Sequence, residues 1–254
     1  LCQLAVCNPK LTMLITTWNC QGAFRRKAQQ IAQLMPDIAV IQECESPAKL
    51  RWAKGVTPPN DFVWFGENSS KGVGIFSWTK WTFTIDPSHD PSIHHCIPVI
   101  ATSGAHGGAE DKVNLLAIWA SGHKQKELSY VGQVYRAVEQ YHDFVRQRPT
   151  FVLGDWNSNA IWDRERPVSN HSNVIKKLAE AGIVSLYHKH FGEAHGKESQ
   201  MTFWLYRDQS KGYHLDYCAA PKTWLPKLQS LRLGDYETWR AWSDHSPLIV
   251  EFNS

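Results

Sequence analysis

Short apolar runs along this chain stop abruptly at polar side chains, and one stretch shows the pattern most clearly. Residues 150–153 form a β-prone run bounded by a proline and by Gly154, which predicts a buried strand. Asp155 and Asn157 follow at its C-terminal end. Because residues two apart in an extended segment point the same way, the carboxylate and the amide are expected to face one site. Taken alone, these residues also fit a polar turn without chemistry.

The same pattern occurs twice near the start of the chain. Residues 13–18 and 38–41 are β-branched and apolar, and they predict two strands that end at Asn19 and Glu43. Between them, apolar positions recur at helical spacing over residues 24–34 until a proline ends the helix. Each strand therefore delivers a polar side chain at its C-terminal end, where α/β sheets commonly bind ligands.

Later elements follow from changes in periodicity. Helical spacing disappears over residues 61–119, where short runs alternate with Gly, Pro and Asp as in antiparallel strands. It returns at 129–146, whereas residues 188–200 are polar and rich in His and Gly, which indicates a long surface loop. The remaining predicted elements are strands at 74–78, 81–85, 95–100, 112–119, 183–187, 201–206, 213–218 and 248–252, a helix at 174–181, and loops at 103–109 and 160–170.

Neither a linker nor a low-complexity tract nor a repeat divides the 254 residues. We therefore expect a single domain over residues 13–254, preceded by a poorly ordered N-terminal extension over residues 1–12.

Composition narrows the class of protein without naming a function. Hydrophobic residues make up 43% and charged residues 20%, as in globular proteins, and the net charge of +3 is compatible with a polyanionic ligand without requiring one. The longest apolar runs are too short for a membrane span, so we expect no membrane insertion. The sequence does not resolve the oligomeric state, and a monomer is favoured. The six cysteines lack zinc-type spacing. This favours reduced thiols in a cytoplasmic protein, and a disulfide involving Cys2 and Cys7 stays open.

Seven polar residues lie on or beside predicted strands and together suggest a metal site. Each alone is more typical of a strand cap or a salt-bridge partner. As a set, four carboxylates, two amides and one imidazole form an oxygen-rich group that suits Mg²⁺ or Mn²⁺, and converging carboxylates repel one another unless a cation neutralises them. The seven residues are Asn19, Glu43, Asp155, Asn157, Asp216, Asp244 and His245.

His245 adds an acid/base group to this set. A carboxylate on one ring nitrogen would fix the tautomer and orientation of the imidazole, which could then act on a water or on a phosphate oxygen. A carbonyl hydrolase could use the same parts, but no Ser or Cys lies in a G-x-S-x-G or comparable frame. Water attack on a phosphate ester is the better match.

The motifs that carry these residues resemble the endonuclease/exonuclease/phosphatase superfamily, in order and over residues 13–253. They are Trp18-Asn19, Gln42-Glu43, Gly154-Asp155-Trp156-Asn157, Leu215-Asp216-Tyr217 and Ser243-Asp244-His245-Ser246-Pro247. Residues 202–206 and 213–217 further resemble exonuclease III-type abasic-site endonucleases. The resemblance implies an α/β fold, a four-layered sandwich of two mixed, largely antiparallel sheets flanked by helices. It also implies a DNA substrate and Mg²⁺, with Mn²⁺ as a substitute.

The resemblance implies roles residue by residue. The implied metal ligands are Glu43, Asn19 and Asp244. The implied catalytic residues are Asp155 on the attacking water, Asn157 on a phosphate oxygen, His245 on the scissile phosphate and Asp216 orienting His245. The implied substrate-binding residues are Phe203, Trp204, Tyr213, His214, Leu215 and Trp119. Of these, Phe203, Tyr213 and Leu215 fall where abasic-site enzymes line the pocket for an extruded sugar.

The chain departs from the family pattern at two positions. Trp119 stands where the family usually offers a histidine or tyrosine to the phosphate, so either His123 or Tyr130 substitutes or the transition state is stabilised differently. Gln21 stands where abasic-site enzymes usually have an acid, which weakens a second metal position. The basic trio at residues 25–27 could contact DNA phosphates, but a solvated helix face is the simpler interpretation.

Three functions remain open at this point. The first is a Mg²⁺-dependent phosphodiesterase acting on DNA, as an abasic-site endonuclease, a 3′-exonuclease or a general DNase. The second is a phosphatase or phosphodiesterase for a small or lipid-like phosphate ester. The third is a nucleic-acid-binding module with a relic site, which the completeness of the seven-residue set argues against.

Overall fold

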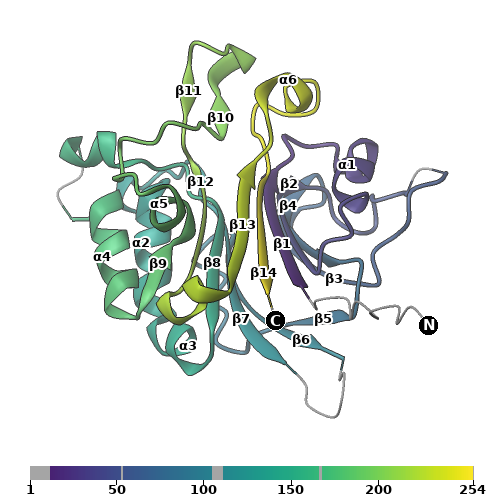
Figure 1. The fold of residues 1–254 in the computed structure, drawn as a ribbon, viewed down its shortest axis with the longest axis horizontal. Helices are drawn as coiled ribbons and strands as arrows, with labels where there is room; N and C mark the ends of the chain where they lie inside the picture. The colour runs from purple at the N-terminus through teal and green to yellow at the C-terminus, as the bar shows by residue number, and fades with distance from the viewer. Residues whose placement is uncertain (1–11, 53, 105–110, 166–167, 254) are drawn as a thin grey trace, which may run out of the picture.

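Two six-stranded sheets pack face to face, and helices cover their outer faces (Figure 1). The computed structural model describes residues 12–52, 54–104, 111–165 and 168–253. Most of the N-terminal extension expected over residues 1–12, most of the predicted loop at 103–109, and Cys2 and Cys7 therefore lie outside the described residues.

Each sheet contains one parallel pair, β1–β2 in the first and β7–β8 in the second, and all other pairs are antiparallel. The first sheet has the order β13 (Leu228–Leu233), β14 (Leu248–Asn253), β1 (Thr12–Asn19), β2 (Ile38–Cys44), β4 (Lys71–Ser77) and β3 (Asp61–Asn68). The second has the order β5 (Trp81–Ile85), β6 (Cys96–Ser103), β7 (Lys112–Trp119), β8 (Thr150–Asp155), β12 (Asp216–Pro221) and β9 (Ile183–Ser185). The predicted fold class is confirmed.

Alternation along the strands creates the layers. In β7, Leu115 and Ala117 join the core between the two sheets, whereas Leu116 and Ile118 join the core beneath the helices of the second sheet. Successive strand residues point to opposite faces, so one fully apolar strand serves two cores. A third core packs Phe24 and its neighbours against the outer face of the first sheet.

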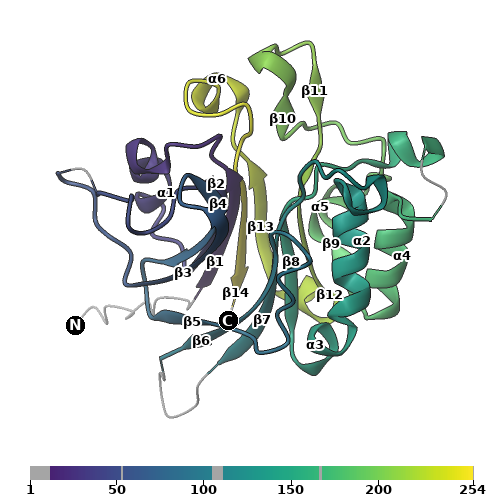
Figure 2. The same cartoon turned by 180° about the vertical axis from the view of Figure 1, so that it is seen from behind.

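Helices cover both outer faces, as Figure 2 shows from behind. The helix α1 (Ala28–Ala32) follows the 3₁₀ turn η1 (Phe24–Arg26) over the first sheet. The second sheet carries α2 (Val131–Gln140), α3 (His142–Gln147), α4 (His171–Glu180) and α5 (Leu186–Phe191). The remaining elements are α6 (Tyr236–Trp239), the two-residue strands β10 (Phe203–Trp204) and β11 (Gly212–Tyr213), and the 3₁₀ turns η2 (Lys126–Leu128), η3 (Ala160–Glu165), η4 (Leu205–Arg207) and η5 (Lys222–Lys227).

Three predicted elements were wrong in extent. The helix expected over 24–34 breaks at Lys27, which has a φ of −122°, and only α1 is α-helical. The helix expected over 129–146 divides at Tyr141 into α2 and α3. The strand expected over 183–187 ends at Ser185, because the chain turns there into α5. In each case the apolar pattern was correct but did not reveal where the backbone changes direction.

Other predicted segments differ from the structure in the kind of element they form. The strands expected over 201–206 and 213–218 form only the short β10–β11 hairpin before β12, and the loop expected over 160–170 begins with η3. The stretch 188–200, expected as a surface loop, starts in α5 and buries the side chains of His188 and Glu198.

Other findings concern the whole chain. Among the described residues, no helix has the length and apolar character that crossing a membrane requires. Four cysteines, Cys20, Cys44, Cys96 and Cys218, are buried free thiols.

Strand directions bring the predicted site residues to one edge. The C-terminal ends of β1 and β2 lie side by side because the two strands are parallel. Thr17 of β1 pairs with Leu248, so the segment just before β14 lies at the same edge. In the second sheet, Asp155 pairs directly with Asp216, because β8 and β12 are antiparallel.

Candidate active site

The centre of this edge is a buried group of two carboxylates and one imidazole. The Nδ1 of His245 lies 2.8 Å from Oδ2 of Asp216, and its Nε2 lies 4.0 Å from Oδ2 of Asp155. Both aspartates are 0% exposed and His245 is 5% exposed. The imidazole therefore bridges two carboxylates out of contact with bulk water.

Electrostatics favour a protonated His245. Burial alone would lower the pKa of His245, but the carboxylates of Asp216, Asp155 and Asp244 raise it to about 10. Burial raises the pKa of Asp155 to about 7, and the charge of Asp216 adds to this effect while that of His245 opposes it. The protonated Nδ1 of His245 can donate to Asp216, and its Nε2 is then a donor for an anionic ligand.

Asp155 is fixed by amide donors. Its Oδ2 accepts hydrogen bonds from Nδ2 of Asn19 at 2.9 Å and from Nδ2 of Asn157 at 2.9 Å, and its Oδ1 accepts from the backbone N–H of Asn157 at 2.8 Å. The side chain of Asn157 also donates to the carbonyl of Ala120 at 2.8 Å. These hydrogen bonds hold the carboxylate in one orientation.

Gly154 makes this placement possible. Its φ of +139° is disfavoured for residues with a side chain, and a Cβ there would lie 1.9 Å from the carbonyl oxygen of Ile118 on β7. Only glycine lets β8 approach β7 this closely immediately before Asp155.

The predicted metal ligands lie beside this group. Glu43 adopts a φ of +56° at a register shift in β2, a bulge that turns its side chain toward β1. Its Oε1 lies 3.4 Å from Nδ2 of Asn19, and its other oxygen forms an ion pair with Lys71. Asp244 accepts a hydrogen bond from Gln21 at 2.7 Å. The structure thus links Glu43 to Asp155 through Asn19, and places Asp244 at the same strand ends.

These residues fit a divalent cation. Ligand atoms of Asp155, Asp216 and His245 lie within 4.8 Å of one another. The Oδ1 of Asp216 is buried and has no hydrogen-bond partner among the described residues. Carboxylate and amide oxygens predominate, which is the donor set of Mg²⁺ and Mn²⁺. The site therefore contains acidic and imidazole groups that can bind a metal.

A sequence model of the endonuclease/exonuclease/phosphatase family matches residues 16–245. The chain belongs to this family. Endonucleases, exonucleases and phosphatases all hydrolyse phosphoric esters, and the chain is a phosphoric ester hydrolase. A sequence search of curated proteins finds no match.

Solved structures of the family share the fold. AP endonuclease LMAP from Leishmania major matches with a TM-score of 0.73 and 13% identity over 97% of this chain and 89% of its own. The 3′ phosphatase NExo from Neisseria, bound to a product DNA hairpin, matches with a TM-score of 0.64 and 22% identity over 95% of this chain and all of its own, 100%. The 3′-5′ exonuclease NExo from Neisseria meningitidis matches with a TM-score of 0.63 and 23% identity, over 95% of this chain and 100% of its own. The predicted membership of the superfamily is confirmed by the family model, and these solved structures share its fold.

Two of the predicted substrate-binding residues, Phe203 and Tyr213, form an aromatic row that starts at His245. The ring of Phe203 lies 4.7 Å from that of His245, between ring centroids, and that of Tyr213 lies 6.4 Å from Phe203. Trp162 on η3 extends this aromatic row, 5.3 Å from Tyr213. From the sequence, Trp162 is expected in the loop at 160–170, exposed enough to touch a ligand.

The other predicted substrate-binding residues are buried. Trp204, His214, Leu215 and Trp119 are 8%, 1%, 4% and 9% exposed. Trp119 packs against His95 in the core between the sheets, with ring centroids 4.5 Å apart. Substrate-binding roles for these four side chains stay predictions, and contact with a substrate would require them to move.

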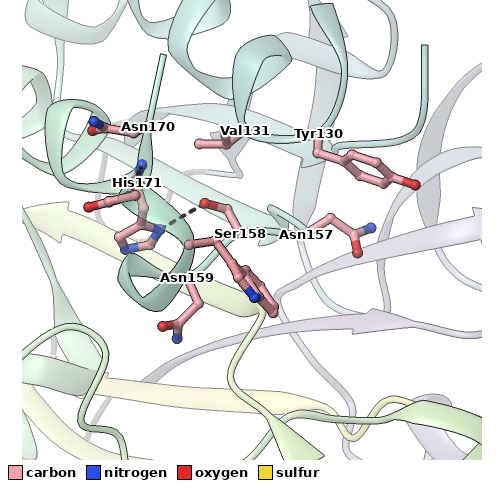
Figure 3. Close-up of a pocket in the computed structure, with 9 residues that line it drawn as sticks. Tyr130, Val131, Asn157, Ser158, Asn159, Asn170 and His171 are labelled. Carbon is pink, nitrogen blue, oxygen red and sulfur yellow. Dashed lines mark hydrogen bonds between the residues drawn. The ribbon is translucent and has the colours of Figure 1, made fainter. Parts of the chain in front are cut away.

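The structure also adds surface residues near the site. Tyr130 is 44% exposed and lines a cavity of about 140 Å³ together with Asn157, Ser158 and His171. Figure 3 shows these residues around the cavity, with the hydroxyl of Ser158 hydrogen-bonded to His171. Of the two residues considered as replacements at the position of Trp119, Tyr130 shares this cavity with Asn157. His123 instead contacts the ring of His94.

Tyr206 and Arg207 were missed as surface residues. Both have positive φ, 58° and 56°, and Tyr206 is 83% exposed on the β10–β11 hairpin. Nothing in a Leu-Tyr-Arg sequence signals left-handed backbone, since these residue types rarely adopt it.

Proposed function

We propose that this chain is a metal-dependent phosphodiesterase that acts on DNA, as an abasic-site endonuclease, a 3′-exonuclease or a less specific DNase. The observation that carries the proposal is the buried His245 between Asp216 and Asp155, beside the carboxylate of Glu43. A fixed cationic donor next to an acid-rich strand edge suits an anionic phosphate and an attacking water better than it suits a carbonyl substrate.

Each side chain has a task in this proposal. Mg²⁺, or Mn²⁺ in its place, would be held by Glu43, Asn19 and Asp244, and when bound it would neutralise charge that develops on the phosphate. Asp155 orients the attacking water and accepts its proton, since its raised pKa places it near neutrality. His245 donates from Nε2 to a phosphate oxygen.

Two further contacts to the phosphate follow from the same cavity. Asn157 donates its amide to a phosphate oxygen once its hydrogen bonds to Asp155 and Ala120 rearrange. Tyr130, at the cavity wall, takes the place that the family usually gives to a histidine or tyrosine and that Trp119 leaves open. The phenol can reach outward because its ring is exposed and anchored only at the start of α2.

DNA is the proposed substrate for two reasons. The related NExo structure contains a product DNA hairpin, and LMAP is an AP endonuclease. In this chain, the β10–β11 hairpin and α6 project at one end of the molecule (Figure 1). The hairpin carries exposed Tyr206 and Arg207 beside Gln21, which Arg207 contacts. An aromatic ring and a guanidinium on a projecting hairpin are suited to stacking on bases and contacting phosphates.

A DNA 3′-phosphatase is the second candidate, because a related structure is described as a 3′ phosphatase. The same residues would then hydrolyse a terminal monoester. The small or lipid-like ester considered from the sequence has no such support.

A substrate panel separates these functions. Purified protein is incubated with Mg²⁺ and abasic duplex, blunt duplex, 3′-phosphate duplex, single strand, RNA and small phosphate esters. We expect cleavage of DNA that EDTA abolishes and that His245→Ala reduces by roughly 10²-fold or more. His142→Ala, on the exposed end of α3 with a side chain 55% exposed, is the matched histidine control. Full activity of His245→Ala on DNA, or turnover of small esters alone, would contradict the proposal.

Tyr130→Phe tests the phosphate contact separately. Removing the hydroxyl should lower kcat on the best DNA substrate about 10-fold or more while the melting temperature stays unchanged. Tyr135→Phe, on the same helix and away from the cavity, serves as the control. Equal kcat for Tyr130→Phe and the unmodified protein would exclude this role.

A further inference from the structure

A second cluster of ionisable side chains lies in the stretch where the sequence suggested a surface loop. The Nε2 of His188 is hydrogen-bonded to Oε1 of Glu198 at 3.0 Å, and the side chains of His188 and Glu198 are 6% and 4% exposed. The ring of His195 stacks on that of His188 with centroids 3.5 Å apart. A polar, histidine-rich segment has therefore folded inward.

The spacing of these groups is that of metal ligands. One ligand atom each from His188, His195 and Glu198 lies within 4.8 Å of the other two. A fourth imidazole is adjacent, because Nε2 of His171 on α4 lies 3.0 Å from Nδ1 of His195. Two or three imidazoles with one carboxylate form a donor set for Zn²⁺ and similar transition metals, which bind nitrogen at about 2.0–2.1 Å. By contrast, the proposed Mg²⁺ ligands at the active-site edge of the sheets, which we call the catalytic edge, are carboxylate and amide oxygens.

Outer hydrogen bonds orient each group. The Nδ1 of His188 lies 2.7 Å from the hydroxyl of Ser185, which leaves its Nε2 toward Glu198. The second oxygen of Glu198 accepts from Asn159 at 3.1 Å. Ser158 contacts Nδ1 of His171 at 3.1 Å, which leaves the other nitrogen toward His195. Partners that fix the far nitrogen of a ligating histidine are typical of metal sites.

One buried nitrogen beside the cluster is unsatisfied. His214 is 1% exposed, its Nδ1 is held at 2.8 Å by the carbonyl of Gln200, and its Nε2 has no hydrogen-bond partner among the described residues. Its ring lies 6.0 Å from that of His188. A buried donor or acceptor without a partner is costly, which marks this region as polar and incompletely satisfied by protein groups alone.

The charge states also suit a cation. Burial lowers the pKa of His171 to about 3 and of His195 to about 4, and neighbouring imidazoles add to both shifts. Burial would raise the pKa of Glu198, but hydrogen bonds from His188 and from the backbone N–H of Gly196 hold it well below its ordinary value. His171 and His195 are therefore neutral and Glu198 is ionised at neutral pH.

We infer that His188, His195 and Glu198 bind a single divalent transition-metal ion of the Zn²⁺ class, with His171 in reach as a fourth ligand. The ion is structural, because it joins α5, the 192–202 segment and the start of α4. Through Ser158 and Asn159 it also fixes the segment that carries Asn157 and lines the cavity beside the active site. This inference does not depend on the proposed DNA substrate.

Metal content and cobalt spectra test the site directly. Untagged full-length protein is dialysed against buffer with Mg²⁺, so that the catalytic edge holds Mg²⁺, and its zinc content is measured by mass spectrometry. We expect about one Zn²⁺ per chain. After chelation, titration with Co²⁺ should give the visible absorption of four- or five-coordinate cobalt with a one-to-one end point, and Zn²⁺ should displace it.

Single substitutions test which residues bind the ion. Glu198→Gln and His195→Asn should each weaken Zn²⁺ binding by at least about 10²-fold, whereas Glu43→Gln at the catalytic edge and His190→Ala on the exposed side of α5 should retain it. Circular dichroism checks that each variant is folded. If the folded, unmodified protein binds neither Zn²⁺ nor Co²⁺ at one equivalent, or if Glu43→Gln alone abolishes binding, the inference is overturned, whatever the other variants do.

Discussion

At the residue scale, the buried charges of the site are paired with one another, which offsets the free-energy cost of removing them from water. Asp155 and Asp216 would repel one another in a site that excludes water, and His245 lies between them as the compensating cation. Burying a single charge without a partner is far more costly than burying a hydrogen-bonded pair. The alignment of His245 therefore depends on Asp216, and its charge depends on both aspartates.

Replacing Asp216 by Asn should lower kcat by roughly 10²- to 10⁴-fold, because the neutral amide no longer stabilises the protonated imidazole or holds its orientation. Initial rates on the best substrate of the panel give kcat and KM, and we expect the loss mainly in kcat. Asp143→Asn, at a side chain 95% exposed on α3, is the control. An unchanged kcat for Asp216→Asn would show that Asp216 has no orienting role.

Protonation of His95 should lower the free energy of unfolding in mild acid. Burial lowers its pKa from 6.5 to about 4, and neither ring nitrogen has a hydrogen-bond partner among the described residues. Between these two pH values the unfolded chain binds a proton that the folded chain does not. The free energy of unfolding should therefore decrease as pH falls through this window, by up to about 1.4 kcal/mol per pH unit for this one group.

Urea unfolding at several pH values measures this slope. His95→Asn removes the titrating group and keeps a residue that tolerates the positive φ of 54° at this position. We expect a shallower decline of stability with acid in the variant, whatever its absolute stability. Identical slopes would mean that His95 already carries its proton in the folded protein.

At the element scale, the two parallel pairs determine where the chemistry lies. In both sheets a helical connection returns the chain to a parallel neighbour, so two strands end at the same edge. The backbones of β7 and β8 are so close that a Cβ on Gly154 would lie 1.9 Å from the carbonyl oxygen of Ile118. The position of Asp155 is thus a consequence of backbone packing.

Gly154→Ala should destabilise the protein by more than about 3 kcal/mol, because both the φ of +139° and the 1.9 Å approach to Ile118 oppose a methyl group. Gly182→Ala is a close comparison. It also has positive φ, +74°, but nothing lies within 4 Å of the added carbon, so only about 1 kcal/mol of backbone strain is expected. Chemical unfolding of both variants measures the difference, and equal losses would be inconsistent with a steric requirement at Gly154.

At the scale of the whole molecule, residues from opposite ends of the chain share one sheet. β14, at the C-terminal end, is hydrogen-bonded to β1 on one side and β13 on the other. Its residues Leu248, Val250 and Phe252 are fully buried between the sheets. This strand therefore contributes both backbone pairing and core side chains to the interface between the sheets.

Deleting residues 248–254 should abolish cooperative thermal unfolding, because it exposes β1 and β13 and removes three core side chains. Deleting residues 1–11, which the sequence suggests are an appendage, should leave the melting temperature within a few degrees of the original. Circular dichroism on both truncated proteins gives the comparison. A cooperative transition without β14 would contradict the central role of this strand.

Local pattern was sufficient for much of the fold and of the site. The strands β1, β5, β7, β8 and β14 were predicted correctly from β-branched runs, because alternation and apolar content are properties of a few neighbouring residues. Glu43 and Asp155 were predicted as site residues for the same reason, since each ends such a run. The sequence also carried enough short motifs, in order, to indicate the family.

Only the tertiary structure decided how these parts meet. The pairing of Asp155 with Asp216, the positive φ of Glu43 and the burial of Trp119 depend on strands that are distant in sequence. The inward turn of His188 and Glu198 was invisible in a polar stretch, because whether a charged side chain is buried depends on partners that other segments supply. Sequence by itself determined which chemistry is available, and tertiary packing decided which groups could be brought together and kept from water.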